Sequence, residues 1–193
     1  YRVLPSRSEY RLTLRFDNAF MRLYEKAKEI GLLSKEKLEY LENAINIVNS
    51  EIERLREISV PMVKANELLE KLGSNQKFAK GIKIGELLKV KEVTYDSLKD
   101  VTEIGDYPEF IKNQIETIIK YDIFIQRENE QIEKFKRLEE MRIPKDFDFS
   151  TVKGISNIAR SGLEEIRPLS IGEASRISGV TGNDIALLIG YLK

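Results

Sequence analysis

The residues near the start of this sequence that are best suited to chemistry are four arginines, Arg7, Arg11, Arg15 and Arg22. The first three are four residues apart, so they share one face of a helix, and their odd numbers also place them on one face of a strand. The run 6–9 has the form of a capping box, which favours the helix. Guanidinium groups bind phosphate through a fork of donors. The row therefore predicts a phosphate contact, and we expect RNA. The alternative, which most charge runs follow, is a solvated network with nearby acidic side chains.

A second group of cations is predicted in the middle of the chain. Residues 74–91 contain five lysines and a single acidic residue, whereas residues 92–116 contain seven acidic residues and two lysines. The whole chain is neutral, with 32 basic and 32 acidic residues. A neutral protein can still bind nucleic acid if its basic groups lie on one face. We therefore predict further phosphate contacts from a glycine-punctuated loop that carries Lys77, Lys80 and Lys83.

The residue types that are missing restrict the chemistry of this chain. It contains no cysteine and no histidine, which removes the thiolate nucleophile, the usual zinc ligands and the commonest general base. The sequence also has no Walker loop and no dinucleotide-binding glycine fingerprint. We therefore predict no catalytic residue, no metal site and no cofactor site within this chain.

Length and composition favour one or two helical domains. The chain has 193 residues, of which 41% are hydrophobic and 33% charged, which is long enough to bury a core. No apolar run approaches the roughly 20 residues that span a bilayer, and we expect a cytoplasmic location. The sequence starts with Tyr1 rather than methionine, so we expect a piece of a longer protein.

Periodicity predicts an all-α fold built on two long antiparallel helices. A short helix capped by Asp17 and ended by Gly31 precedes the first long helix, which runs from Ser34 to about Ser59. The first long helix has a strict heptad seam at Leu38, Leu41, Ile45, Val48, Ile52 and Leu55. The second is expected from about 109 to 141, after Pro108. The seam predicts pairing within the chain, and the alternative is a coiled-coil dimer.

The last residues predict a small three-helix subdomain, so we divide the chain into domains 1–145 and 146–193. Residues 152–156 and 177–181 form a near-repeat in which a turn glycine and a capping Ser or Thr precede a helix. A capping box at Ser170–Glu173 opens the helix between them. This pattern allows a phosphate-binding turn similar to a helix-hairpin-helix, a compact knob without a ligand, or half of a partner interface.

Two long motifs resemble one known family. Residues 6–23 read SRSEYRLTLRFDNAFMRL, and residues 167–188 read RPLSIGEASRISGVTGNDIALL. Both are similar to signatures of the MnmG (GidA) family of tRNA uridine 5-carboxymethylaminomethyl modification enzymes. The resemblance covers essentially the whole chain and only the C-terminal helical region of the family. Glu173 stands where the family usually has glutamine, and Gly182 where it usually has proline.

The resemblance implies a role in tRNA modification. The family is a homodimeric flavoprotein that works with the GTPase MnmE on carbon 5 of the wobble uridine, using FAD, NADH and methylenetetrahydrofolate. The FAD domain, with its glycine fingerprint and cysteines, would lie upstream of this chain. The present region would bind tRNA near its anticodon and dock MnmE, and we expect the docking residues to be Ser170, Ile171, Arg176, Ile185, Leu188 and Tyr191. The alternative is a non-catalytic helical adaptor that dimerises without contacting RNA.

Overall fold

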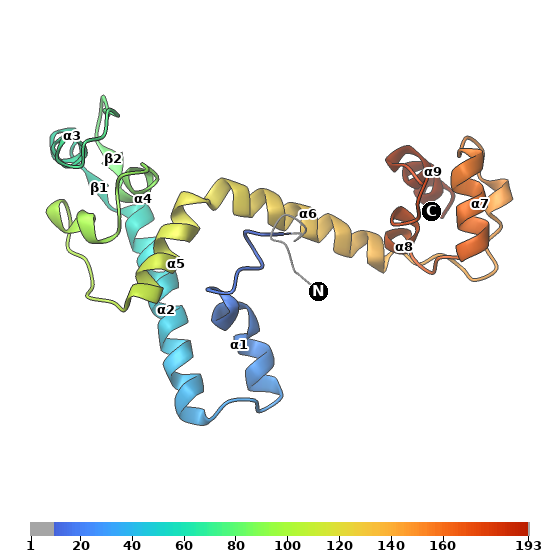
Figure 1. Cartoon of the computed structure of the whole chain (residues 1–193), viewed down its shortest axis with the longest axis horizontal. Helices are drawn as coiled ribbons and strands as arrows, with labels where there is room; N and C mark the ends of the chain where they lie inside the picture. The colour runs from blue at the N-terminus through green and yellow to red at the C-terminus, as the bar shows by residue number, and fades with distance from the viewer. Residues whose placement is uncertain (1–9, 193) are drawn as a thin grey trace, which may run out of the picture. The chain divides into compact units, whose positions relative to one another are not determined.

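A computed structural model describes residues 10–192 of the chain. The polypeptide is mainly helical (Figure 1), which confirms the all-α class. It divides into two compact units, Tyr1–Glu128 and Asn129–Lys193, called unit 1 and unit 2 below. The boundary falls inside helix α6 (Asp122–Glu140). Within residues 10–192, no helix is both long enough and apolar enough to cross a bilayer.

Unit 1 begins with a helical hairpin formed by α1 (Ala19–Glu29) and α2 (Lys35–Glu57), which lie side by side in Figure 1. Gly31 ends the first helix in a left-handed conformation, with φ 64°, which glycine adopts without a Cβ clash. Ser34 then caps α2, because its side chain accepts a 3.4 Å hydrogen bond from the backbone N–H of Lys37.

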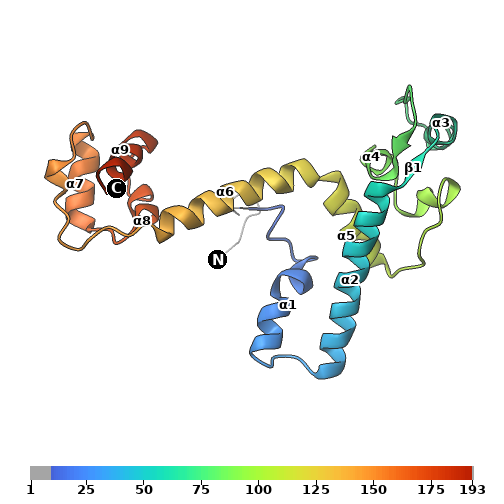
Figure 2. The same ribbon diagram turned by 180° about the vertical axis from the view of Figure 1, so that it is seen from behind.

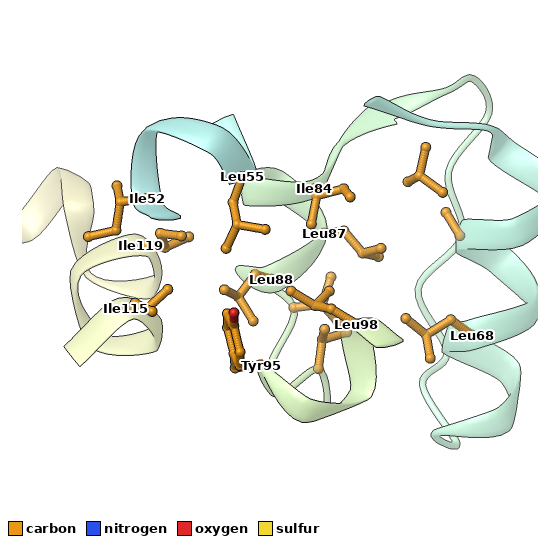
Figure 3. Close-up of a cluster of buried hydrophobic side chains, with 14 of the residues drawn as sticks. Ile52, Leu55, Leu68, Ile84, Leu87, Leu88, Tyr95, Leu98, Ile115 and Ile119 are labelled. Atoms are coloured by element: carbon orange, nitrogen blue, oxygen red, sulfur yellow. The ribbon is translucent and has the colours of Figure 1, made fainter. Parts of the chain in front are cut away.

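The second half of the heptad seam of α2 is covered by helices of the same unit, which agrees with the predicted pairing within the chain, whereas Leu38, Leu41 and Ile45 are half-buried. Val48, Ile52 and Leu55 are buried against α4 (Ile84–Leu88) and α5 (Glu109–Lys120). Figure 3 shows Ile52 and Leu55 in this core beside Ile115 and Ile119 of α5. Burying each large apolar side chain contributes on the order of 1.5–3 kcal/mol, so this contact is the main stabilising feature of unit 1.

The two packed helices run in the same direction, so the expected antiparallel arrangement is wrong for this pair. The rings of Tyr40 and Phe110, near the start of each helix, are 6.5 Å apart. Arg56 and Asp122, at the far ends, form an ion pair at 3.1 Å. The physical reason is that residues 58–108 carry the chain from the end of α2 back to its beginning before α5 starts, as the two ribbon views show (Figures 1 and 2).

This returning segment contains short helices and one small two-stranded ladder. Strands β1 (Ser59–Val60) and β2 (Ile82–Lys83) pair antiparallel, and helix α3 (Met62–Lys71) lies between them in the sequence. A short 3₁₀ helix, η2 (Asp96–Asp100), follows α4. Apolar side chains along this segment join the core of α2 and α5, which fixes the position of β2.

The second predicted long helix is interrupted. The structure has α5 and α6 separated at Tyr121, whose backbone leaves the helical region with φ −105° and ψ 14°. The first part is amphipathic and buries Ile111, Ile115 and Ile119, whereas α6 has no buried residue. The two halves therefore differ in packing as well as in direction.

Unit 2 contains the end of α6, the 3₁₀ turn η3 (Phe149–Thr151), and helices α7 (Asn157–Ile166), α8 (Ile171–Ser175) and α9 (Gly182–Leu192). The backbone of residues 141–143 is tied to that of residues 169–171 by hydrogen bonds of 3.0 and 2.9 Å. These contacts group residues 129–145 with the tail, although the sequence analysis placed them with the preceding helix.

Candidate functional site

The first predicted site, the arginine row, is described from Tyr10 onward, and Arg7 lies outside the described residues. Residues 10–14 form a turn and not the expected helix, with the N–H of Leu14 bonded to the carbonyl of Tyr10 at 2.8 Å. Helix α1 begins only at Ala19. The spacing of four residues between Arg11 and Arg15 therefore does not place them on one helical face.

Arg15 is largely buried and binds other parts of unit 1. Its Nε donates to the Asp17 carboxylate at 3.0 Å, and its Nη2 donates to the Gln114 side-chain oxygen at 2.9 Å. Gln114 completes the triangle with a 2.6 Å bond to Asp17. Burial opposes ionisation of Asp17, but the Gln114 hydrogen bond and the Arg15 charge hold its pKa below the usual value. Arg15 therefore joins the start of the chain to α5.

Arg11 and Arg22 are exposed. The Arg22 guanidinium donates to Asn18 at 2.8 Å and to the carbonyl of Arg15 at 3.0 Å. The Arg11 side chain has no hydrogen-bond partner among residues 10–192. Of the three described arginines, Arg11 has the most donors available to a ligand.

Glu128 of α6 fixes the turn that carries Arg11. Its carboxylate accepts from the backbone N–H of Leu12 at 3.3 Å and of Thr13 at 2.5 Å, and also from the Thr13 hydroxyl. A carboxylate that accepts several N–H bonds holds a turn strongly, because bonds to a charged acceptor exceed neutral ones in strength. Sequence reasoning missed Glu128, because no local pattern connects residues 115 positions apart.

The predicted lysine loop is anchored at its centre. The side chain of Asn66 in α3 donates to the Phe78 carbonyl at 3.0 Å and accepts from the Phe78 N–H at 2.9 Å. Phe78 also packs against the core. Lys77 and Lys80 flank this anchor and are exposed, so the loop presents both ammonium groups to solvent.

Lys83 belongs to a hollow of about 280 Å³ in unit 1, which we call the basic hollow. Its residues come from α2, β2, α4, the position after α4, α5 and the first position of α6: Arg56, Lys83, Gly85, Glu86, Lys89, Ile119 and Asp122. Arg56 pairs with Asp122 at 3.1 Å, and Lys89 pairs with Glu86 at 2.6 Å. The amine of Lys83 donates to the carbonyl of Glu57 at 2.6 Å.

The basic hollow brings three cations together. Two carboxylates also line it, and the Lys83 amine lies 4.0 Å from the Glu57 carboxylate, so an anion would have to share these cations with acidic neighbours. Because the antiparallel ladder pairs Lys83 with Ser59, it brings Lys83 close to the end of α2 and to Arg56. Arg56 carried no signal in the sequence, since it is one of many charged residues on the polar face of a helix. Among residues 10–192, no group of acidic residues could hold a metal ion.

Four of the six residues expected to dock a partner lie in the core of unit 2. Ile171 and Leu188 are fully buried, and Ile185 is 8% exposed. Ser170, 1% exposed, caps α8 by accepting from the Glu173 N–H at 3.1 Å. These side chains stabilise unit 2: Ser170 caps a helix, and the three apolar side chains fill the core. They offer no surface to a partner.

The other two expected docking residues are accessible. Arg176 binds Glu139 and lies over the Phe135 ring, with 5.4 Å between its guanidinium carbon and the ring centroid. The hydrogen bond from Arg176 holds the pKa of Glu139 below its usual value. Tyr191 is 45% exposed, and its hydroxyl accepts from the Lys153 N–H at 3.1 Å.

Comparison with known proteins identifies relatives along the whole chain. Residues 35–129 match the family model described as the tRNA modifying enzyme MnmG/GidA C-terminal helical domain, and residues 131–193 match that of its C-terminal helical bundle. The Fusobacterium nucleatum protein named tRNA uridine 5-carboxymethylaminomethyl modification enzyme MnmG 1 is 62% identical over 192 residues. The protein MnmG of Caldicellulosiruptor saccharolyticus is 42% identical over 195 residues.

A solved structure shares the fold. Aquifex aeolicus GidA, in its form II crystal, superposes with a TM-score of 0.71 at 31% identity over 100% of this chain and 30% of that one. The present chain likewise spans 31% of each of the two curated relatives, while 100% of it is matched.

Proposed function

Because the chain belongs to the MnmG/GidA family of tRNA modifying enzymes, as part of their C-terminal region, we propose that it holds tRNA while another part of the protein carries out the chemistry. The observation that supports this role is the positive surface of unit 1: the basic hollow, the exposed Lys77 and Lys80, and Arg11 on its anchored turn. Ammonium and guanidinium groups spread over one unit suit the spaced phosphates of an RNA backbone.

The reaction served by this binding is proposed from the names of the relatives and from the family resemblance of the two sequence motifs. We propose that the whole protein, a homodimer acting with the GTPase MnmE, installs the (carboxymethyl)aminomethyl group at carbon 5 of the wobble uridine of tRNA. FAD, NADH and methylenetetrahydrofolate would serve that reaction. The basic hollow, at about 280 Å³, is just below the size range of pockets for drug-sized ligands, so we assign no residue of this chain to a dinucleotide such as FAD.

Docking of MnmE is proposed for the accessible face of unit 2. Arg176 and Tyr191 remain the candidates, and the exposed Ile158 and Ile166 add apolar area to the same unit. Tyrosine and arginine are the side chains that most often dominate the energy of a protein interface. The four core residues named above are no longer part of this proposal.

The proposed tRNA contact is tested by removing the three lysines. We expect Lys77→Gln, Lys80→Gln and Lys83→Gln together to weaken tRNA binding by the 193-residue chain. They should also reduce the slope of log affinity against log salt concentration by about 2–3, because binding through fewer phosphate contacts releases fewer counterions. Fluorescence anisotropy with labelled tRNA at four salt concentrations gives both quantities.

The matched control is Lys37→Gln, at the first turn of α2. Lys37 is exposed and, at 1.5 Å of rise per residue, lies about 30 Å from the end of α2 beside which Lys83 lies. This variant should bind tRNA as the unmodified chain does. If the triple variant does the same, unit 1 does not hold tRNA through these lysines.

The alternative function, a dimerising adaptor without RNA contact, depended on a free heptad seam. The second half of that seam is covered within unit 1, so only the half-buried Leu38, Leu41 and Ile45 remain for a partner helix. Light scattering of the 193-residue chain with and without tRNA separates the two. A stable dimer whose mass is unchanged by tRNA would favour the adaptor.

A further inference from the structure

Unit 2 contains a second hollow that none of the roles above uses. Its volume is about 300 Å³, and six residues line it: Pro144, Lys145, Phe149, Arg167, Pro168 and Leu169. We call it the tail hollow. The segment after α6 supplies one wall, and the segment between α7 and α8 supplies the other. The fold of unit 2 therefore brings together two segments, 144–149 and 167–169, that are 18 to 25 positions apart in the sequence.

The charged groups of the tail hollow are both positive. Lys145 and Arg167 are exposed, and no carboxylate is among the lining residues. Neither cation forms an ion pair within residues 10–192. The Arg167 Nη1 donates to the carbonyl of Phe147 at 3.3 Å, and the other guanidinium donors remain available. The nearby Asp148 carboxylate lies outside the lining; hydrogen bonds from Ser150 and, in smaller part, the charge of Arg167 hold its pKa below the usual value. In the basic hollow of unit 1, by contrast, carboxylates pair directly with the lining cations.

The backbone holds these cations in place. Arg167 has a left-handed conformation, with φ 52°, and its N–H bonds to the carbonyl of Leu163 at 3.0 Å. This conformation is unfavourable for a residue with a Cβ, and glycine usually occupies it at the end of a helix. On the other side, the Leu169 carbonyl accepts from the Ile143 N–H at 3.0 Å. The arginine at the end of α7 therefore has a conformational cost that glycine would avoid, which indicates a role for its side chain.

The remaining surface of the tail hollow is apolar. Phe149 is 2% exposed and forms the floor, packed edge-on against Phe147 with 5.2 Å between the ring centroids. The short apolar side chains of Pro144, Pro168 and Leu169 line the rest of the hollow. A volume of 300 Å³ is at the small end of ligand pockets. It suits a single small unit that has an anionic end and a flat apolar body.

We propose that the tail hollow binds one unstacked nucleotide of RNA. Arg167 and Lys145 would bind its phosphate, and the sugar and base would lie against the prolines and Leu169. Proteins bind single-stranded RNA with cations along the backbone and with side chains, usually aromatic, against the base; here the apolar side chains of the hollow would take the second role. This inference rests on the proposed tRNA function and adds a contact in unit 2 that is separate from the lysines of unit 1.

The test removes both charges and leaves the shape of the hollow. We expect Lys145→Gln with Arg167→Gln, in the 193-residue chain, to weaken tRNA binding at least several-fold. The slope of log affinity against log salt concentration should fall by about 0.7, the value for one phosphate of a single strand. Lys153→Gln is the matched control, because Lys153 is an exposed lysine of unit 2 that does not line the hollow.

Three outcomes decide the matter. Loss of affinity and of slope in the double variant, with Lys153→Gln unchanged, supports the proposal. If the double variant and the control bind tRNA equally, the proposal is overturned, whatever the lysine variant of unit 1 shows. If the double variant binds tRNA normally but no longer binds purified MnmE, the hollow takes an acidic protein segment and the RNA assignment is wrong.

A crosslinking map keeps the test valid if the double variant fails to fold. The unmodified chain is irradiated with tRNA that carries 4-thiouridine, and crosslinked peptides are identified by mass spectrometry. We expect crosslinks within 144–149 or 167–169. Crosslinks confined to unit 1 would overturn the tail-hollow proposal and leave the proposed function intact. No crosslink anywhere would contradict both.

Discussion

The carboxylate of Asp184 accepts a 2.9 Å hydrogen bond from the backbone N–H of Ser156, which precedes it by 28 residues. The same carboxylate accepts from the N–H and hydroxyl of Thr181, at 2.9 and 2.6 Å. Ser156 caps α7, and Thr181 stands at the start of α9. One buried acidic side chain therefore joins the two helix starts that the near-repeat in the sequence marked out.

We predict that Asp184→Asn destabilises the chain by roughly 1–3 kcal/mol at pH 7, because one backbone N–H loses a charged acceptor. The hydrogen bond from the Thr181 hydroxyl, with those from the two backbone N–H groups, holds the pKa of Asp184 below its ordinary 3.8. Its stabilising effect is therefore present above pH 3.8 and is lost as the pH falls through the lower, folded-state pKa. Thermal unfolding followed by circular dichroism between pH 2 and 7 measures both effects. The exposed Glu164→Gln is the control, and equal behaviour of the two variants would contradict the assignment.

Arg11 and Arg15 should respond in opposite ways to substitution. Arg15→Ala should cost about 1–3 kcal/mol of stability, since Asp17 and Gln114 each lose the hydrogen bond from the guanidinium in a part-buried site and keep only the bond to each other. Arg11→Ala should change stability by less than about 0.5 kcal/mol, as expected at an exposed position, and should weaken tRNA binding. Urea unfolding and anisotropy on the same two preparations test this. If Arg15→Ala affected only tRNA affinity, its bracing role would have to be abandoned.

Glu128→Ala should release the turn that carries Arg11. The amides of Leu12 and Thr13 lose their acceptor, so we expect their hydrogen exchange to accelerate about tenfold, which corresponds to about 1.4 kcal/mol. Glu130→Ala, an exposed neighbour on α6, should leave exchange there unchanged. Hydrogen exchange resolved by NMR at single amides makes the comparison direct.

The buried pair Tyr95 and Glu51 should dominate the alkaline behaviour of unit 1. The Tyr95 hydroxyl donates to Glu51 at 2.7 Å and accepts from the Gly105 N–H at 3.2 Å. Burial and the neighbouring carboxylate raise the pKa of Tyr95 well above its ordinary 10.0. A raised pKa means that the stabilisation is complete below pH 10.0 and is lost as the pH rises toward the folded-state pKa.

Tyr95→Phe should therefore be less stable than the unmodified chain by about 1–3 kcal/mol at pH 7, and the difference should narrow above pH 10. Unfolding temperatures of the two proteins between pH 7 and 11.5 give this difference directly. Surface lysines titrate in the same way in both proteins, so their effect cancels in the difference between the two unfolding temperatures. A difference that stays constant with pH would show that the Tyr95 hydroxyl does not titrate on unfolding.

Arg167→Gly should separate stability from binding in unit 2. Glycine relieves the left-handed conformation, with φ 52° at this position, so we expect the variant to be as stable as the unmodified chain or more stable, by up to about 1 kcal/mol. Its affinity for tRNA should fall, because the cation is gone. Differential scanning calorimetry and anisotropy measure the two effects. A marked loss of stability would indicate that the bond from Arg167 to the Phe147 carbonyl is the main role of the side chain.

The local features of this protein could be predicted where one segment contains the whole signal. The cap at Ser34, the turn at Gly31 and the cap at Ser170 each depend on residues a few positions apart, and the structure contains all three. The heptad seam of α2 is buried in its second half. The family resemblance was equally accessible, because two long motifs are continuous in the sequence. The arginine row was harder to interpret, because a spacing of four residues places side chains on one helix face only if the segment is helical.

The amino-acid sequence by itself determined the helical class, the ends of most helices, the exclusion of thiol and imidazole chemistry, and the family. These depend on residue type and short-range geometry. Only the tertiary structure decided which charged groups are available: it placed Arg15 in an internal network, anchored Arg11 through Glu128, and assembled two hollows from distant segments. The physical reason is that a charge is free or neutralised according to its neighbours in space, and those neighbours are set by packing of the whole chain.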